Sequence, residues 1–241
     1  MVCRCEMKYE AEAMTEDRES RALPGGRDLL AAVGLLTVLP VERPEPKSDA
    51  FGRAVLFFPC VGLMMGVVLV GLNWLSAGWM SAWWTAVLLV GAWEALSRGE
   101  MLWAVVSRRR GGGLAAAVVV LAKIVGLAVA RLRPAALLFA PMLARWCMVV
   151  LATGARDAHT PSQKFNSGVS FREFALTSVF TCAVVFSLTE AVGILVVVCV
   201  AALTLGLRLL LHRWPGGVSW PLLQASAELI ETLTVVLFAA L

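Results

Sequence analysis

The sequence predicts an all-α fold, a polytopic transmembrane helical bundle of six to seven spans, and two observations carry this prediction. Of the 241 residues 59% are hydrophobic and only 16% are charged, whereas soluble domains are closer to half apolar and a quarter charged. The apolar residues are also gathered into long runs, and a helix that spans a membrane needs about 20 of them. Together these features indicate an integral membrane protein.

Seven segments come close to the length of a spanning helix. They are Ala54–Leu75, Ala77–Leu96, Leu114–Ala130, Pro134–Ala152, Phe174–Thr189, Ala191–Leu211 and Val218–Leu241. The third and the fifth have 17 and 16 residues, which is short for a span. The sequence therefore leaves six and seven spans open.

The chain before the first span divides into two parts. The run Leu29–Val41 is apolar but has only 13 residues, so it predicts a short helix that lies at the interface or re-enters the membrane. Residues 1–28 are polar and of mixed charge, which predicts a disordered cytoplasmic tail. Residues 29–241 are then expected to form a single integral membrane domain.

The distribution of basic residues predicts the orientation. The loops 97–113 and 153–173 and the turn near Arg208 and Arg213 are basic and would share the side of the N-terminal tail, whereas only Arg131 and Arg133 would lie on the other side. Because cytoplasmic loops carry the excess of Lys and Arg, the tail and the long loops are expected in the cytoplasm. Four tryptophans near the opposite face are typical of an aromatic belt, Trp74, Trp79, Trp83 and Trp84.

Ionisable side chains inside the apolar segments are the candidates for chemistry, because each costs roughly 2.5–3.5 kcal/mol to insert into a membrane. These residues are Glu94, Lys123, Arg145, Glu190, Glu228 and Glu231. Glu228 and Glu231 are three residues apart, which places both carboxylates on one helix face. They could hold a divalent cation, or they could neutralise Lys123 and Arg145 within the bundle.

Other motifs carry less information. The six cysteines show no CxxC or Cys/His spacing, so neither zinc nor a disulfide framework is expected. The three glycines 111–113 are not followed by Gly-Lys-Ser/Thr and do not form a phosphate-binding P-loop. Gly62 and Gly66 form a small-xxx-small pattern, which predicts close contact between two helices.

A collinear set of segments resembles a known family. These segments are "LLAAVGLLTVLPV" at 29–41, "GRAVLFFPCVGLMMG" at 52–66, "APMLARWCMV" at 140–149 and "RWPGGVSWPLLQASAELIETL" at 213–233, with Lys123 inside an apolar helix between them. Taken in this order they resemble the cobalamin synthase family, adenosylcobinamide-GDP ribazoletransferase, over roughly residues 29–241.

The resemblance implies a reaction and its partners. Family members act late in adenosylcobalamin (vitamin B12) biosynthesis, joining adenosylcobinamide-GDP and α-ribazole, or its 5′-phosphate, with release of GMP. It also implies a multi-pass protein of the bacterial inner membrane, Mg²⁺ as cofactor, and association with other late enzymes of the pathway. No nucleic-acid partner is expected.

The resemblance also suggests which residues would serve the reaction. Arg53, Arg108, Arg109 and Arg145 would bind the substrate phosphates, Glu228 and Glu231 would contribute to the metal site, and Lys123 would be an intramembrane charge partner. Developing charge in a phosphoryl transfer is usually neutralised by Mg²⁺ held on carboxylates.

The chain departs from the family pattern at the expected metal ligands. The family has an Asp-rich stretch after its second apolar segment, where this chain has "WEALSRGEMLWAVVSRRRGGG" at 93–113, which holds no aspartate. A terminal Thr-Gly-Asp is replaced by Ser219-Trp220-Pro221. These losses favour an alternative, a catalytically inactive membrane scaffold or corrinoid-binding partner.

Overall fold

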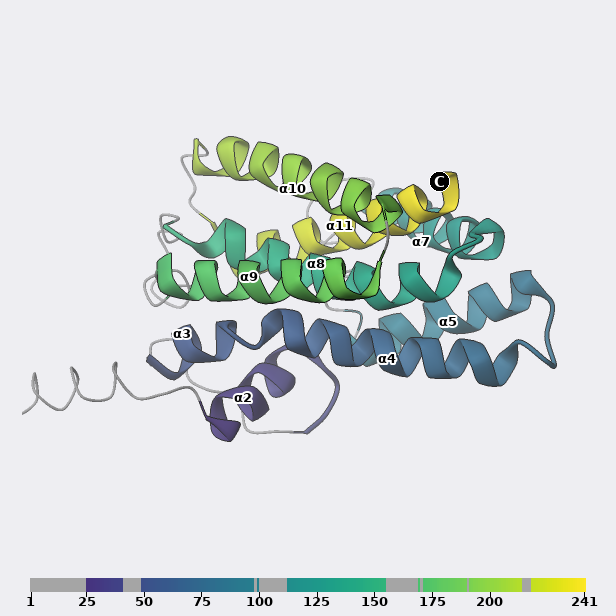
Figure 1. Ribbon diagram of the computed structural model, residues 1–241, viewed down its shortest axis with the longest axis horizontal. Coiled ribbons are helices and arrows are strands. Elements are labelled where there is room, and N and C mark those ends of the chain that lie inside the picture. The colour runs from purple at the N-terminus through teal and green to yellow at the C-terminus, as the bar shows by residue number, and fades with distance from the viewer. Residues whose placement is uncertain are drawn as a thin grey trace, which may run out of the picture.

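The computed structural model in Figure 1 describes residues 25–40, 49–97, 99, 112–154, 169, 171–189, 191–213 and 218–241. Within these residues the chain forms nine helices and no β-strand. The helices are α2 (Gly26–Leu36), α3 (Asp49–Val55), α4 (Phe58–Ser76), α5 (Ala82–Leu96), α7 (Gly112–Val129), α8 (Arg133–Ala152), α9 (Phe171–Leu188), α10 (Ala191–His212) and α11 (Trp220–Ala240).

Six of the described helices are long and apolar enough to cross a membrane. These are α4 and the five helices from α7 to α11, and each has at least 18 residues. The seventh apolar helix, α5, has 15 residues, about 22 Å at the rise of an α-helix. The polytopic all-α bundle predicted from the sequence is therefore confirmed.

Helix α5 begins five residues later than the sequence indicated. The predicted segment started at Ala77, but residues 77–79 form a turn in which the N–H groups of Trp79 and Met80 donate to the carbonyl of Ser76, at 3.0 and 3.1 Å. The helix starts only after Ser81, which has an extended backbone. Trp79 lies in this turn, and the other tryptophans of the predicted belt, Trp74, Trp83 and Trp84, flank it. Each of the four is more than half exposed.

The first predicted span is two helices rather than one. It was expected to start at Ala54, but Ala54 and Val55 end the short helix α3, and a turn at Leu56 and Phe57 separates α3 from α4. Pro59 lies in the first turn of α4, where a residue without an N–H does not interrupt the hydrogen bonds of the helix.

Helix α2 is the short helix predicted before the first span, although it begins at Gly26 rather than Leu29. Its start is set by Asp28, whose carboxylate accepts a hydrogen bond from the Gly25 N–H at 2.9 Å, as in a capping box. With 11 residues it cannot span a membrane. After α2, the Val38 N–H donates to the Leu96 carbonyl at 3.0 Å, which ties this segment to the end of α5.

Helix α8 forms the centre of the bundle, and α4 and α11 make its most extensive contacts. A Cβ atom at Gly62 would lie 2.5 Å from the Pro141 carbonyl oxygen, and one at Gly66 would lie 2.6 Å from that of Leu138. Because only glycine allows this approach, the predicted small-residue contact between helices is confirmed. The outer helices α9 and α10 instead expose apolar side chains such as Val179, Phe186 and Leu209, as expected of helices that face lipid.

Candidate functional site

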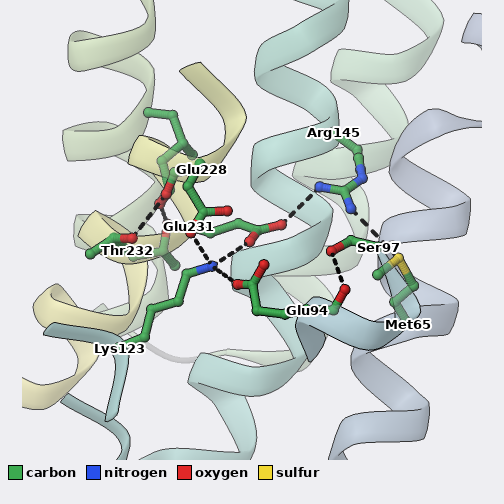
Figure 2. Close-up of polar contacts among 10 residues, drawn as sticks. Met65, Glu94, Ser97, Lys123, Arg145, Glu228, Glu231 and Thr232 are labelled. Carbon is green, nitrogen blue, oxygen red and sulfur yellow. Dashed lines mark hydrogen bonds and ion pairs between the residues drawn. The ribbon is translucent and has the colours of Figure 1, made fainter. Parts of the chain in front are cut away.

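Five charged side chains from four helices meet inside the bundle, and we refer to Glu94, Lys123, Arg145, Glu228 and Glu231 as the charge cluster (Figure 2). Helix α5 supplies Glu94, α7 supplies Lys123, α8 supplies Arg145, and α11 supplies Glu228 and Glu231. Lys123 and Arg145 have no exposed side-chain surface, and Glu228 and Glu231 are 1% exposed. The sequence predicts all five at membrane depth, and the sixth candidate, Glu190, lies outside the described residues.

Lys123 lies at the centre of the charge cluster. Its Nζ is 2.6 Å from Glu228 Oε1, 2.9 Å from Glu231 Oε2 and 3.1 Å from Glu94 Oε1. The same ammonium lies 4.9 Å from the ring centroid of Trp93, a distance at which the aromatic face stabilises a cation. A single positive charge is thus surrounded by three carboxylates and an aromatic ring.

Glu231 joins the two basic residues. Its Oε2 accepts a hydrogen bond from Lys123 Nζ at 2.9 Å, and its Oε1 accepts one from Arg145 Nη1 at 2.8 Å. Arg145 Nη2 also lies 3.7 Å from the sulfur of Met65, on α4. Charges buried in a low-dielectric interior require such partners, because the desolvation of each ion is costly.

The local sequence explains why the carboxylates point inward. The three-residue spacing of Glu228 and Glu231 places both on the face of α11 that contacts α7 and α8. Glu94 is close to the end of α5, where Gly99 has φ of +60° and its N–H donates to the Glu94 carbonyl at 2.7 Å. A left-handed glycine after the last turn is a common helix ending, and here it leaves the Glu94 side chain beside α7.

The charge cluster does not fit a metal site as it stands. Within the described residues, no group of three or more His, Cys, Asp or Glu side chains could hold a metal ion. The three carboxylates of the cluster instead face Lys123, and Glu231 also faces Arg145. The assignment of a metal to Glu228 and Glu231 stays a prediction, and so does that of phosphate binding to Arg145.

Of the other predicted phosphate-binding residues, the structure describes Arg53, which pairs outside the charge cluster. Arg53 Nε lies 3.3 Å from Asp28 Oδ1, and this ion pair joins α3 to α2. Arg108 and Arg109 lie outside the described residues. Their roles in binding substrate therefore remain predictions.

Three residues near these sites were missed by the sequence reasoning. Trp93 and Met65 are not among the predicted site residues, although they contact Lys123 and Arg145 respectively. Asp28 was assigned to the disordered tail, but it caps α2 and pairs with Arg53. An acid just before an apolar run is a capping signal that could have identified Asp28; no local pattern identifies the other two.

Two arginines that the sequence analysis used only to predict orientation donate hydrogen bonds to carbonyl groups at the ends of helices. Arg133 donates to the carbonyls of Leu127 and Ala128 at the end of α7, at 2.6 and 3.0 Å. Arg208 donates to the carbonyls of Val150 and Thr153 at the end of α8, both at 2.9 Å. Both satisfy carbonyl groups that a helix end leaves without partners.

Comparison with known proteins identifies a family that this chain matches. The family model described as cobalamin-5-phosphate synthase matches residues 28–102 and 110–239. The interval between the two matched segments falls in the stretch 93–113, which holds no aspartate.

Individual relatives agree with this assignment. An adenosylcobinamide-GDP ribazoletransferase of Roseiflexus sp. (strain RS-1) is 28% identical over 235 residues, which cover 85% of this chain and 86% of the relative. Proteins of the same name from Pseudomonas fluorescens and Pseudomonas paraeruginosa are 42% and 43% identical over 69 and 72 residues, 28% and 30% of this chain and 28% and 29% of the relatives. No solved structure matches the chain significantly. The extent of the family match shows that this chain belongs to the cobalamin-5-phosphate synthase family.

Proposed function

We propose that this protein is an adenosylcobinamide-GDP ribazoletransferase. It would join adenosylcobinamide-GDP and α-ribazole, or α-ribazole 5′-phosphate, and release GMP in a late step of adenosylcobalamin biosynthesis. The observation that supports this most is the family match over residues 28–102 and 110–239. The relative from Roseiflexus, which bears this name, aligns over most of both chains.

The proposed reaction is a displacement at phosphorus. The oxygen of a ribazole hydroxyl forms a bond to the phosphorus nearest the cobinamide, and the bond from that phosphorus to the bridging oxygen breaks. GMP leaves with the electron pair, and the hydroxyl proton is released to solvent. Such reactions depend on positioning and on neutralisation of the charge that develops on the phosphate oxygens. Arginine suits this role because it binds phosphate bidentately, which is why Arg53, Arg108, Arg109 and Arg145 are the proposed phosphate ligands.

Arg145 and Lys123 would offer this positive charge in the buried interior of the bundle, where an electrostatic interaction is stronger than in water. Arg145 is held by Glu231 at 2.8 Å, so a phosphate would have to share it with that carboxylate. Mg²⁺, if it takes part, would neutralise the substrate phosphates when bound. Glu228 and Glu231 are the residues proposed for it, and both face Lys123 in the structure.

The reaction is tested with the full chain reconstituted in lipid. We expect GMP to form from adenosylcobinamide-GDP and α-ribazole, and product formation to fall sharply in Arg145→Met. A matched control is Arg131→Met, which removes an exposed arginine at the turn between α7 and α8. Parallel reactions with Mg²⁺ and with a chelator establish whether the metal is required. Absence of GMP under every metal condition would refute the proposed activity.

The alternative of an inactive scaffold is not supported by the comparisons, since the relatives carry the name of a transferase. The same reconstitution separates the two hypotheses, because a scaffold would retain corrinoid binding without releasing GMP. Association with other late enzymes of the pathway stays a prediction from the resemblance. We further propose that the protein lies in the bacterial inner membrane with its long basic loops in the cytoplasm, as the charge distribution indicates.

A further inference from the structure

An apolar cavity of about 300 Å³ lies between α2 and α4. The described residues that line it are Val33 of α2, residues 37–39 that follow α2, four residues of α4 and Leu96 at the end of α5. Helix α2 lies beside α4 at the edge of the bundle (Figure 1). An engineered protein cavity of about half this volume binds benzene, so this one has room for part of a hydrocarbon chain.

The side chains that line this cavity suit an apolar ligand. Among the described lining residues, Thr37 is the one with a hydroxyl group, and its Oγ1 donates to the Val33 carbonyl at 2.7 Å. The same oxygen accepts a hydrogen bond from the Leu39 N–H at 3.4 Å. An ordered water needs two to four polar partners, and the described lining side chains do not supply them.

The mouth of the cavity opens on the outer surface of α4. Met64 and Val68 are four residues apart on this helix, and both are more than half exposed, as is Leu39 on another wall. Helix α4 is long and apolar enough to cross a membrane, so its exposed apolar side chains face lipid. The cavity is therefore continuous with the surface of the bundle that contacts the bilayer.

The inner wall of the cavity borders the charge cluster. Val61 and Met65, also four residues apart on α4, line the cavity and are buried. The sulfur of Met65 lies 3.7 Å from Arg145 Nη2, and Figure 2 shows the two side chains next to each other. The side chain of Met65 thus contacts the cavity as well as the buried guanidinium.

We propose that this cavity binds the acyl chain of a membrane phospholipid. The chain enters past Met64, Val68 and Leu39 and packs against Val61 and Met65. Its hydrocarbon matches the apolar lining, and the mouth lies on the surface where acyl chains are the solvent. The bound chain supports Met65 in its contact with Arg145. This inference goes beyond the transferase reaction and does not depend on it.

The proposal is tested by photo-crosslinking of the full chain in detergent. Phosphatidylcholine with a diazirine in the middle of one acyl chain is added at a low ratio of lipid to protein, and adducts are mapped by mass spectrometry of peptides. Adducts are expected at Leu39, Met64 and Val68 in preference to Val118 of α7, which is 57% exposed and is not part of the cavity lining. Excess unlabelled phosphatidylcholine should suppress them.

Two variants fill the cavity from different helices. Val33→Phe adds a ring from α2, and Val68→Phe adds one from α4. Each methylene group that loses its apolar contacts lowers the affinity roughly fourfold, so exclusion of two of them should reduce cross-linking at the cavity about tenfold. Val118→Phe is the matched control for Val68→Phe, since Val68 is 55% and Val118 57% exposed, and it should leave cross-linking at the cavity unchanged.

Melting temperatures give a second readout. Phosphatidylcholine added to the wild type in detergent is expected to raise the melting temperature until the site is saturated, because a ligand that binds only the folded state stabilises it. Val33→Phe should show a smaller response to the lipid, while Val118→Phe should respond as the wild type does. A lipid that only coats the surface would affect all three proteins equally.

Three results would overturn the proposal. One is equal labelling of Val118 and the cavity residues, which would indicate lipid spread over the surface. The second is undiminished labelling in folded Val33→Phe and Val68→Phe. The third is suppression of the cavity adducts by adenosylcobinamide-GDP or α-ribazole, because the cavity would then bind a substrate. If neither filled variant folds, the wild-type labelling pattern and these competition experiments decide the matter.

Discussion

At the scale of single residues, Glu231 links the two basic members of the charge cluster. One of its oxygens accepts a hydrogen bond from Lys123 and the other accepts one from Arg145. Buried ion pairs are weak evidence for net stabilisation, but removal of one partner leaves an uncompensated charge in the interior. The stability of the folded protein should therefore depend on Glu231 more than on any other carboxylate of the cluster.

Replacement of Glu231 by Gln tests this dependence. The variant keeps the shape of the side chain but leaves two buried cations facing an amide, and we expect a loss of roughly 3–5 kcal/mol in the free energy of unfolding. Glu94→Gln removes one partner of Lys123 at a more exposed position, so its loss should be smaller. Denaturation of both variants in detergent measures the difference. Equal losses would show that Glu231 has no special place in the cluster.

At the scale of helices, the packing of α4 on α8 depends on two glycines. Gly66 lies so close to α8 that an added Cβ would be 2.6 Å from the Leu138 carbonyl oxygen and 2.8 Å from its Cα. These are backbone atoms and cannot rotate away. The face of α4 that contains Gly62 and Gly66 can therefore pack this closely on α8 only when both positions are glycine.

Gly66→Ala is therefore expected to separate α4 from α8. Overpacking of this kind typically costs about 1–3 kcal/mol, and the melting temperature should fall accordingly. Gly71→Ala, in the same helix, is the matched control, because a Cβ there meets no atom within 4 Å. It should be neutral or slightly stabilising, since alanine favours the helix. A stable Gly66→Ala would indicate that the two helices can move apart at little cost.

The arginines that donate to carbonyls at helix ends, Arg133 and Arg208, also act at the scale of helices. The contribution of Arg208 to stability can be compared with that of another arginine near the end of α10. It donates to two carbonyls at the end of α8, whereas Arg213, near the end of α10, is exposed. Hydrogen bonds from a charged group contribute roughly 1.5–3 kcal/mol, and partial exposure reduces this. We expect Arg208→Met to lower the free energy of unfolding by about 1–2 kcal/mol, and Arg213→Met to have little effect. If chemical denaturation gives the same free energy of unfolding for Arg208→Met and Arg213→Met, the capping role of Arg208 is contradicted.

At the scale of the whole molecule, the turns between helices lie at the two ends of the bundle. Figure 1 shows the turn between α4 and α5 at one end of the molecule together with the C-terminus, and α3 and the end of α10 toward the other. The end with the α4–α5 turn carries exposed tryptophans, and the opposite end carries Arg208 and Arg213. Such asymmetry predicts which end faces the cytoplasm.

This orientation is tested with single cysteines in a cysteine-free background. A cysteine at Gly78, in the α4–α5 turn, should react with a membrane-impermeant maleimide added outside intact cells. A cysteine at Arg213 should react only after the membrane is opened. The reverse labelling pattern would contradict the cytoplasmic placement of the basic loops, and labelling of both positions from outside would contradict the helix order of the bundle.

The sequence by itself determined the class of protein, the approximate positions of the spans, the short helix that precedes them and the identity of the buried charges. These follow from local composition and periodicity, because a membrane sets a minimum length and makes each buried charge conspicuous. Helix ends were less predictable, because the turn after Ser76 and the break between α3 and α4 lie within predominantly apolar runs and depend on backbone hydrogen bonds.

Only the tertiary structure decided which charges are partners. Lys123 and Glu231 are 108 residues apart, and Arg145 and Glu231 are 86 apart, so no spacing along the chain relates them. The three-residue interval of Glu228 and Glu231 allowed both a metal site and a neutralising pair. Helix α7 packs against α5 and α11, and α11 also packs against α8. This packing brings an ammonium between the carboxylates, because helix packing, rather than sequence distance, sets which side chains meet.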